Sequence, residues 1–158
     1  MAIDVTILPA TRFHSTILAP VMREGDREEV WATGRYTPQA ALDASLDASS
    51  RSWSGFADGR LVVMFGVGAV PDAPRVGVPW LLGSDDVVRY QVQFLRRCRD
   101  YVSDMLREFE VLTNWVDARN AVSLRWLAWM GAEFLPAVPF GALGLPFHQF
   151  IIKRSGHV

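Results

Sequence analysis

Lysine and cysteine are almost missing from this chain of 158 residues, in which Lys153 is the only lysine and Cys98 the only cysteine. A single cysteine excludes an intramolecular disulfide and any zinc site built from several thiolates. The three histidines, His14, His148 and His157, are scattered and form no pair at metal-ligand spacing. We therefore expect no metal site.

Strong net charge and long apolar runs are also missing. The formal net charge is −1, so bulk electrostatics gives no attraction to nucleic acid or to an anionic membrane surface. No apolar run approaches the length of about 18 residues that a membrane-spanning helix needs. Residues 1–10 lack a basic start followed by an apolar stretch, which predicts no secretory signal. We expect a soluble, cytoplasmic protein with neither a nucleic-acid nor a membrane partner.

The residues that are present suit a single domain over residues 1–158. Half of them are hydrophobic and 21% are charged, a balance that supports a sizeable core. Nearly all basic residues are arginine. This bias agrees with a GC-rich coding sequence, and its functional alternative is bidentate binding of phosphate or carboxylate.

Turn residues and apolar periodicity predict alternating strands and helices. Asp58-Gly59 lies between two β-rich runs and predicts a tight hairpin, whereas Thr37-Pro38 predicts the start of a helix. Apolar residues at three- and four-residue steps predict a long amphipathic helix over 94–109. Strands are expected at 3–8, 52–57, 60–70, 75–82, 111–116, 132–140 and 147–153, and helices at 17–33, 39–50, 94–109 and 120–130. The order β-α-α-β-β-β-α-β-α-β-β predicts an α/β fold with a central mixed sheet and helices on both faces.

This order, together with one segment, resembles the GNAT (GCN5-related N-acetyltransferase) fold. Within Asn114–Phe134, a predicted strand leads to Asn120, which opens a helix that Gly131 closes. The spacing from Asn120 to Gly131 is that of the family, although Ala132 occupies the position where the family usually has Phe. The resemblance implies the GNAT fold and acetyl-CoA as the cofactor.

The resemblance also implies a cofactor site. Strand 78–82 stands where the family separates two strands, so Trp80, Leu81 and Leu82 are expected to present backbone groups to pantetheine and the acyl carbonyl. An ordinary core strand is equally compatible with these residues. The resemblance places Asn120 beside this site and Arg89 near the phosphates of the cofactor. Alternatively, Arg89 is a solvated charge on the surface of a helix.

Two features depart from the family. The turn Gly83–Gln93 has no closely spaced glycines before the long helix, and its Asp85 and Asp86 would repel a diphosphate. Leu127 occupies the position where many relatives carry a Tyr that protonates the departing thiolate. No catalytic residue is therefore assigned from the sequence.

A closer resemblance links the chain to a family of tailed-phage proteins described as GNAT-like or as internal virion proteins. It rests on Met22–Val30, Pro79–Leu82 and Asn114–Asn120, which match in the same order. It implies a phage or prophage origin and a location in the host cytoplasm or within the virion.

Two functions follow from these patterns. The preferred one is a GNAT-fold phage protein with degenerate cofactor chemistry that acts as a binding or virion-associated component. The alternative is an acyl-CoA-dependent N-acetyltransferase in which arginines form a non-standard pyrophosphate site, so enzymatic activity stays an open question. Trp126 and Trp129 lie three apart on one predicted helix, which indicates core packing or, alternatively, an exposed aromatic patch for a protein partner or for self-association.

Overall fold

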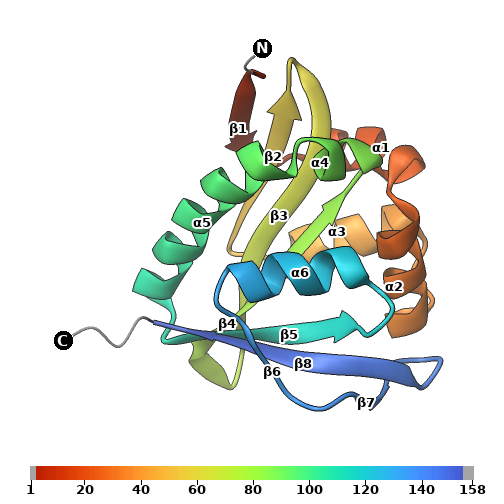
Figure 1. Ribbon diagram of the computed structural model, residues 1–158, viewed down its shortest axis with the longest axis vertical. Helices are drawn as coiled ribbons and strands as arrows, with labels where there is room; N and C mark the ends of the chain where they lie inside the picture. Colours follow the sequence, from red (N-terminus) through yellow and green to blue (C-terminus); the bar gives the residue numbers. More distant parts are fainter. Residues whose placement is uncertain (1–2, 155–158) are drawn as a thin grey trace.

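An eight-stranded sheet with helices on both faces forms the framework of the computed structural model, which describes residues 3–154 (Figure 1). The elements are β1 (Val5–Pro9), α1 (Arg12–Leu18), the 3-10 helix η1 (Ala19–Val21), α2 (Glu24–Gly34), α3 (Pro38–Ala48), β2 (Arg51–Ala57), β3 (Arg60–Val70), β4 (Ala73–Gly83), α4 (Asp85–Arg89), α5 (Gln91–Glu108), β5 (Val111–Asp117), α6 (Ala121–Trp129), β6 (Glu133–Phe134), β7 (Val138–Phe140) and β8 (Leu145–Lys153).

The strand order divides the sheet into two parts. The strands follow the order β1-β2-β3-β4-β5-β8-β6, and β7 pairs with β8 outside this path. Every pair is antiparallel except β4 with β5, which run parallel and pair only at Val76–Val111 and Gly77–Leu112. Beyond these two positions the strands diverge, as Figure 1 shows, and the sheet opens between them.

The predicted fold class is confirmed, and so are most of the elements. The Asp58-Gly59 turn has positive φ at both residues, as a two-residue hairpin requires. Thr37 caps α3 by accepting a hydrogen bond from the Ala40 N–H, and Gly131 follows α6 with a φ of 92°.

The single helix predicted at 17–33 is wrong. The chain instead forms α1, η1 and α2, with Pro20 inside η1. Proline has no N–H to donate and crowds the preceding turn, so it ends a helix that precedes it. Arg23 then adopts an extended conformation with a ψ of 152° before α2 begins. Two smaller differences are the extra short helix α4 and the division of the predicted strand 132–140 into β6 and β7.

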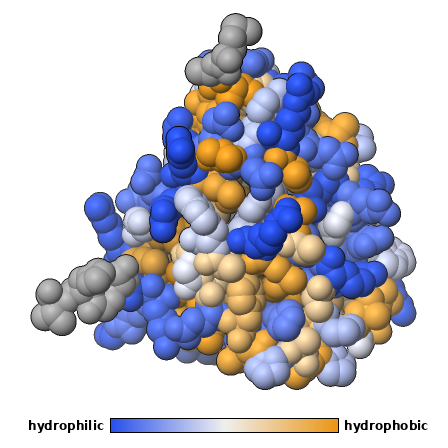
Figure 2. All heavy atoms as spheres, viewed as in Figure 1, coloured by the Kyte–Doolittle hydropathy of each residue, from blue (hydrophilic) through white to orange (hydrophobic). Residues whose placement is uncertain are grey.

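Two hydrophobic cores lie on the two faces of the sheet. On one face, β3 and β5 pack against α5 through Phe94, Cys98 and Met105, which form the buried side of the predicted amphipathic helix. The outer side of α5 is charged, and Figure 2 shows hydrophilic residues along the left edge where this helix lies. On the other face, Leu18 of α1 and Leu42 of α3 cover the sheet.

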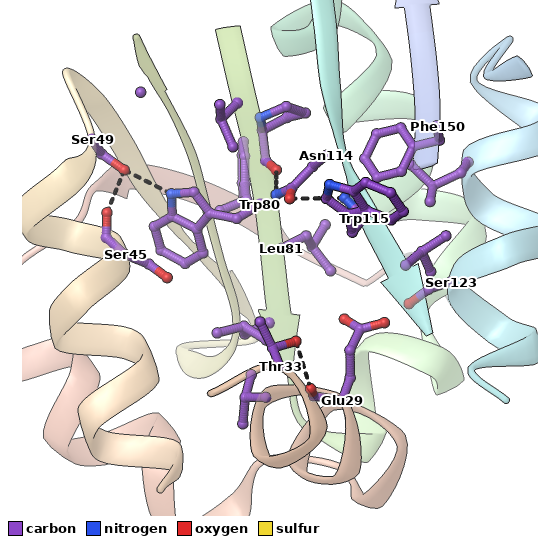
Figure 3. Close-up of a pocket in the computed structure, with 18 of the residues that line it drawn as sticks. Glu29, Thr33, Ser45, Ser49, Trp80, Leu81, Asn114, Trp115, Ser123 and Phe150 are labelled. Carbon is purple, nitrogen blue, oxygen red and sulfur yellow. Dashed lines mark hydrogen bonds between the residues drawn. The ribbon is translucent and has the colours of Figure 1, made fainter. Parts of the chain in front are cut away.

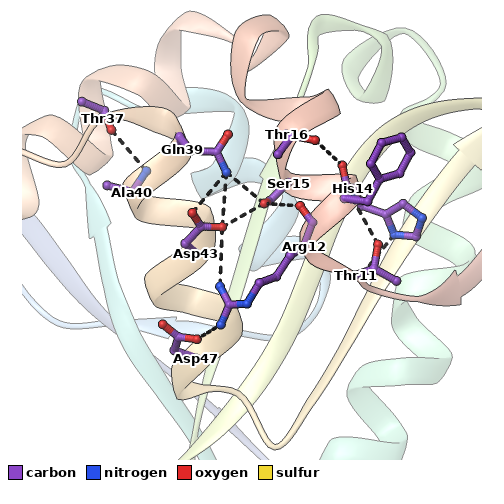
Figure 4. Close-up of polar contacts among 11 residues, drawn as sticks. Thr11, Arg12, His14, Ser15, Thr16, Thr37, Gln39, Ala40, Asp43 and Asp47 are labelled. Carbon is purple, nitrogen blue, oxygen red and sulfur yellow. Dashed lines mark hydrogen bonds and ion pairs between the residues drawn. The ribbon is translucent and has the colours of Figure 1, made fainter.

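A polar network joins α1 to α3 (Figure 4). Ser15 is fully buried, and its hydroxyl donates to Asp43 Oδ1 at 2.9 Å while it accepts from Gln39 Nε2 at 3.0 Å. Arg12 forms ion pairs with Asp43 and Asp47 at the outer edge of this network. Satisfied buried polar groups fix the relative position of two helices more strictly than apolar contacts do, so this network places α3 on the sheet.

The carboxyl end of α3 lies directly against β3. A Cβ atom placed on Gly68 would stand 2.2 Å from the carbonyl oxygen of Ala48, far inside van der Waals contact. The backbones can approach this closely only because position 68 carries no side chain.

We predict that Gly68→Ala destabilises the fold by about 1–3 kcal/mol, because α3 must move away from β3. The exposed neighbour provides the control, since Ala69→Ser adds an atom on the same strand without this contact. Chemical denaturation of both variants measures the difference. Equal stability of the two variants would show that the contact between α3 and β3 is not tight.

Candidate functional site

A cavity of about 470 Å³ passes through the sheet where β4 and β5 diverge (Figure 3). Its walls come from both faces of the sheet. One half, on the α2 and α3 face, is lined by Glu29, Thr33, Tyr36, Ala41, Ala44, Ser45, Ala48, Ser49, Trp80 and Trp115 among others. The other half, on the α5 and α6 face, is lined by Phe65, Leu81, Cys98, Val102, Met105, Ser123, Trp126, Leu127, Met130, Phe150 and Ile152. The volume lies within the range of about 300–1,000 Å³ typical of small-molecule sites.

The edge of β4 that faces β5 presents backbone groups to this cavity. Along a strand, the N–H and C=O groups of alternate residues point to the same side. The Pro79 carbonyl accepts from Asn114 Nδ2 at 2.8 Å, and the Gly83 N–H donates to Asp26 Oδ2 at 2.9 Å, both away from β3. Leu81 lies between these two residues, and its N–H therefore points into the opening.

Asn114 bridges the narrow end of the opening. Its Nδ2 donates to the Pro79 carbonyl of β4, and its Oδ1 accepts from the N–H of Trp115 on its own strand at 2.8 Å. The side-chain amide thus replaces the peptide groups that would continue the ladder between β4 and β5. Trp80 and Trp115 extend from the two strands on either side of the cavity (Figure 3), and the Trp80 Nε1–H donates to Ser49 Oγ at 2.7 Å.

Helix α2 closes the wide end of the opening with two carboxylates. Asp26 accepts from the Gly83 N–H at the end of β4, and Glu29 Oε1 accepts from the Asp117 N–H at the end of β5 at 2.8 Å. The two acidic residues are three positions apart and lie on one side of the helix. One turn of α2 therefore binds the ends of both diverging strands.

A buried arginine links these carboxylates to α6. Arg23 forms an ion pair of 2.8 Å with Asp26, and its Nη2 also donates to Asn120 Oδ1 at 2.7 Å and to Ser123 Oγ at 3.0 Å. The guanidinium lies 5.6 Å from the centroid of the Trp126 ring. Arg23, Asp26 and Asn120 are all buried, so each depends on the others for its polar contacts.

The carboxyl group of Asp117 is neutralised separately. Arg119 donates to it from Nε at 3.1 Å and from Nη2 at 2.8 Å, and the Arg119 N–H donates to Asp117 Oδ1 at 2.9 Å. This bidentate contact leaves Arg119 paired with its neighbour and not with Glu29.

Glu29 has the electrostatic properties of an acid–base residue. Burial, and after it the negative charges of Asp26 and Asp117, raise its pKa from the usual 4.5 to about 7, against hydrogen bonds from the Asp117 N–H and Asn120 that lower it. The stability contribution of such a group is full below about 4.5 and is lost as the pH rises through about 7. The hydrogen bonds from the Asp117 N–H and, at 3.3 Å, from Asn120 Nδ2 both use Oε1, so Oε2 is the oxygen left for a ligand in the cavity.

Of the five residues that the sequence placed in a cofactor site, three line the cavity and two do not. Trp80, Leu81 and Leu82 line the cavity. Arg89 is an exposed residue at the end of α4, with its guanidinium 5.2 Å from the centroid of the Tyr90 ring, and it is not among the lining residues. Asn120 is buried, caps α6, and hydrogen-bonds to two residues that line the cavity, Glu29 and Ser123.

Sequence reasoning missed Arg23, Asp26 and Glu29. The available signal was a pair of acidic residues three apart on a largely polar helix, which is also the pattern of a solvated helix face. Nothing local marks these carboxylates as buried, because the strand ends that bind them come from residues 83 and 117.

Several other side chains are placed by the structure. Cys98 is buried, and burial raises the pKa of its thiol to about 12. Trp126 is buried and donates to Gln91 Oε1 at 2.9 Å, whereas Trp129 is half-exposed beneath Arg99. The two tryptophans therefore do not form one exposed aromatic face.

Residues 3–154 hold no group of three or more His, Cys, Asp or Glu side chains that could bind a metal ion, and His157 lies outside them. Within the same residues, no helix is both long enough and apolar enough to cross a membrane.

In the turn after β4, several backbone N–H groups are already hydrogen-bonded to acceptors within the protein. The Gly83 N–H donates to Asp26, and the Ser84 N–H donates to the Val62 carbonyl at 2.9 Å. The N–H groups of Asp86 and Val87 donate to Ser84, at 3.3 Å to its hydroxyl and 3.1 Å to its carbonyl. The short helix α4 occupies this turn, which lacks the closely spaced glycines of the family.

No protein-family model matches the chain, and no curated protein matches it in sequence. Solved structures match nearly its whole length. A putative acetyltransferase from Acinetobacter baylyi has a TM-score of 0.71 at 14% identity, covering 98% of this chain and 95% of that one. A putative acetyltransferase from Salmonella typhimurium, solved with its cofactor acetyl-CoA, has a TM-score of 0.65 at 13% identity, with 98% and 96% covered. A GCN5-related N-acetyltransferase from Kribbella flavida has a TM-score of 0.69 at 16% identity, with 95% and 98% covered.

These matches confirm the predicted GNAT fold. At sequence identities of 16% or less, these matches show only that the fold is shared, because proteins with unrelated activities can have the same fold. The three structures carry no indication of a phage origin.

We predict that Arg23→Met destabilises the fold by about 3–5 kcal/mol, because it leaves the buried Asp26 without its cation. Arg27→Met is the matched control, since Arg27 is an exposed arginine on the same helix. Thermal denaturation distinguishes the two variants. Similar unfolding temperatures would mean that the network around Arg23 does not hold the opening together.

Proposed function

We propose that the protein is an N-acyltransferase, which moves an acyl group from a thioester to an amine in the cavity between β4 and β5. The observation that carries the proposal is the convergence of two groups on one cavity. Leu81 supplies a backbone N–H that points into the opening, and Glu29 supplies a carboxyl with a pKa of about 7. An oriented donor and a base near neutral pH are the two requirements of acyl transfer to an amine.

Leu81 acts on the acyl carbonyl. Its N–H donates a hydrogen bond to the carbonyl oxygen, which gains negative charge as the amine attacks. The donor is fixed in a strand and faces a cavity with apolar walls, so its stabilisation of that charge is stronger than in water.

Glu29 acts on the amine. Its carboxylate accepts a proton from the nitrogen as the new bond from nitrogen to the acyl carbon forms and the bond from that carbon to sulfur breaks. The electron pair of the broken bond leaves with the sulfur as a thiolate. Leu127 has no proton to give, so the thiolate takes its proton from water.

The residues around the opening fit a pantetheine thioester as the donor. The α5 and α6 half of the cavity is apolar, through side chains such as Val102, Met105 and Met130. The edge of β4 offers backbone groups to an amide. The Salmonella typhimurium structure that shares this fold holds acetyl-CoA, which supports an acetyl or another short acyl group here.

We predict that kcat/KM for acyl transfer rises with pH and shows an inflection at about 7, because Glu29 must be ionised to accept a proton. Glu29→Gln lowers the rate by about 100- to 10,000-fold and removes this pH dependence. Glu28→Gln, an exposed neighbour on α2, keeps both the rate and the profile. Thiol release from acetyl-CoA with a panel of primary amines provides the assay. A profile that Glu29→Gln leaves unchanged would assign the base to another residue.

A second candidate function is a phage or virion-associated binding protein without acyl transfer. Two observations favour it, namely the internal use of the backbone donors after β4 and the absence of a proton donor at Leu127. The phage origin itself rests on the sequence resemblance of Met22–Val30, Pro79–Leu82 and Asn114–Asn120. Calorimetry with acetyl-CoA separates the candidates, since a folded protein that releases no heat at millimolar ligand fits only the binding protein.

A further inference from the structure

The phosphate-binding part of a coenzyme A donor would meet a turn after β4 whose first backbone donors are already used. A diphosphate is held in proteins by free backbone N–H groups at the start of a helix. Here four of the candidates are used internally, since the N–H groups of residues 83, 84, 86 and 87 all donate to acceptors of the protein itself. To bind a diphosphate, the turn must give up bonds that hold α2 and α4 in place.

The charge of this turn also opposes an anion. Asp85 and Asp86 occupy the first turn of α4. Arg60 pairs with Asp86 at 3.0 Å, whereas Asp85 is exposed. Carboxylates beside a diphosphate repel it, and the partial positive charge of a five-residue helix is too small to offset that repulsion.

The nearby arginines are directed elsewhere. Arg89 lies over Tyr90, Arg97 donates to the Val5 carbonyl at 3.2 Å, and Arg99 lies over Trp129 with 4.4 Å from its guanidinium carbon to the ring centroid. Arg96 is exposed on the polar side of α5. No cluster of cations therefore replaces the missing backbone donors within the described residues.

The pantetheine arm, in contrast, has a built site. The α5 and α6 half of the cavity offers apolar walls such as Val102 and Met130, and Leu81 presents its backbone to the centre. Asn114 already places a side-chain amide between the two strands, with its Nδ2 bound to the Pro79 carbonyl. The opening thus accepts an amide group, which is the repeating polar unit of pantetheine.

We infer that the protein recognises its acyl donor through the pantetheine arm alone and not through the nucleotide diphosphate. The inference rests on the proposed acyl transfer. The donor is then an acyl thioester of pantetheine or phosphopantetheine, carried either by coenzyme A or by a carrier protein. The two sources share the arm, and they differ only in what lies beyond the phosphate.

The test compares donors of different length on the full chain. With one amine acceptor, kcat/KM is measured for acetyl-CoA, for S-acetylpantetheine and for an acetylated carrier protein. We expect acetyl-CoA and S-acetylpantetheine to agree within about tenfold, because one lost diphosphate contact corresponds to a larger factor. A loss of more than tenfold with S-acetylpantetheine would overturn the inference. A higher kcat/KM for the carrier protein than for both small donors would identify it as the source.

Two arginine variants test directly whether an arginine binds the diphosphate of acetyl-CoA. Arg89→Ala and Arg96→Ala are expected to leave kcat/KM for acetyl-CoA within about threefold of the parent chain. A loss confined to acetyl-CoA, with S-acetylpantetheine unaffected, would show that these arginines bind the diphosphate and would contradict the inference. No product from either donor with a folded protein would contradict the proposed acyl transfer itself, and this outcome is distinct from a difference between donors.

Discussion

Two carboxylates on one turn of α2 hold the ends of two strands that no longer pair with each other. Asp26 binds the N–H of Gly83 at the end of β4, and Glu29 binds the N–H of Asp117 at the end of β5. A divergent sheet exposes backbone groups that must find other partners when water is excluded. The cavity can exist because α2 supplies those partners at its wide end and Asn114 supplies them at its narrow end. The opening in the sheet is therefore stabilised by the side chains around it and is not a local defect in strand pairing.

The same arrangement sets the chemistry of the cavity. Two acidic residues one turn apart repel each other when both are ionised. Arg23 pairs with Asp26, so that carboxyl keeps a buried cation beside it. Glu29 accepts its hydrogen bonds from a backbone N–H and an amide and not from a cation, and burial is the main reason that its pKa rises to about 7. A division of roles follows, in which Asp26 and Arg23 are structural and Glu29 is poised to exchange a proton near neutral pH. The backbone of Leu81 and the carboxyl of Glu29 then approach the cavity from two different elements, which is how a site joins groups far apart in sequence.

Local patterns were sufficient for most of the framework. The Asp58-Gly59 hairpin, the cap at Thr37 and the apolar side of α5 depend on neighbours in the sequence, and these predictions are confirmed. The helix predicted at 17–33 failed because it required Pro20 in its first turn, whereas Pro20 lies in η1, between α1 and α2. Trp80, Leu81 and Leu82 could be placed beside the opening from the position of β4 in the fold, and they line the cavity. Glu29 was beyond reach, because its burial and its pKa depend on Asp117 and Asn120, which lie about ninety residues away.

The ionisation of Glu29 is the point on which the chemical account depends. A titration of the Glu29 side-chain carboxyl followed by ¹³C NMR in the folded protein observes it without any substrate. The account predicts a midpoint at about pH 7, displaced to lower pH in Asp26→Asn, because that change removes a neighbouring negative charge. A midpoint near the usual 4.5 would contradict the account, since such a carboxylate is ionised like any surface acid and has no special role as a base.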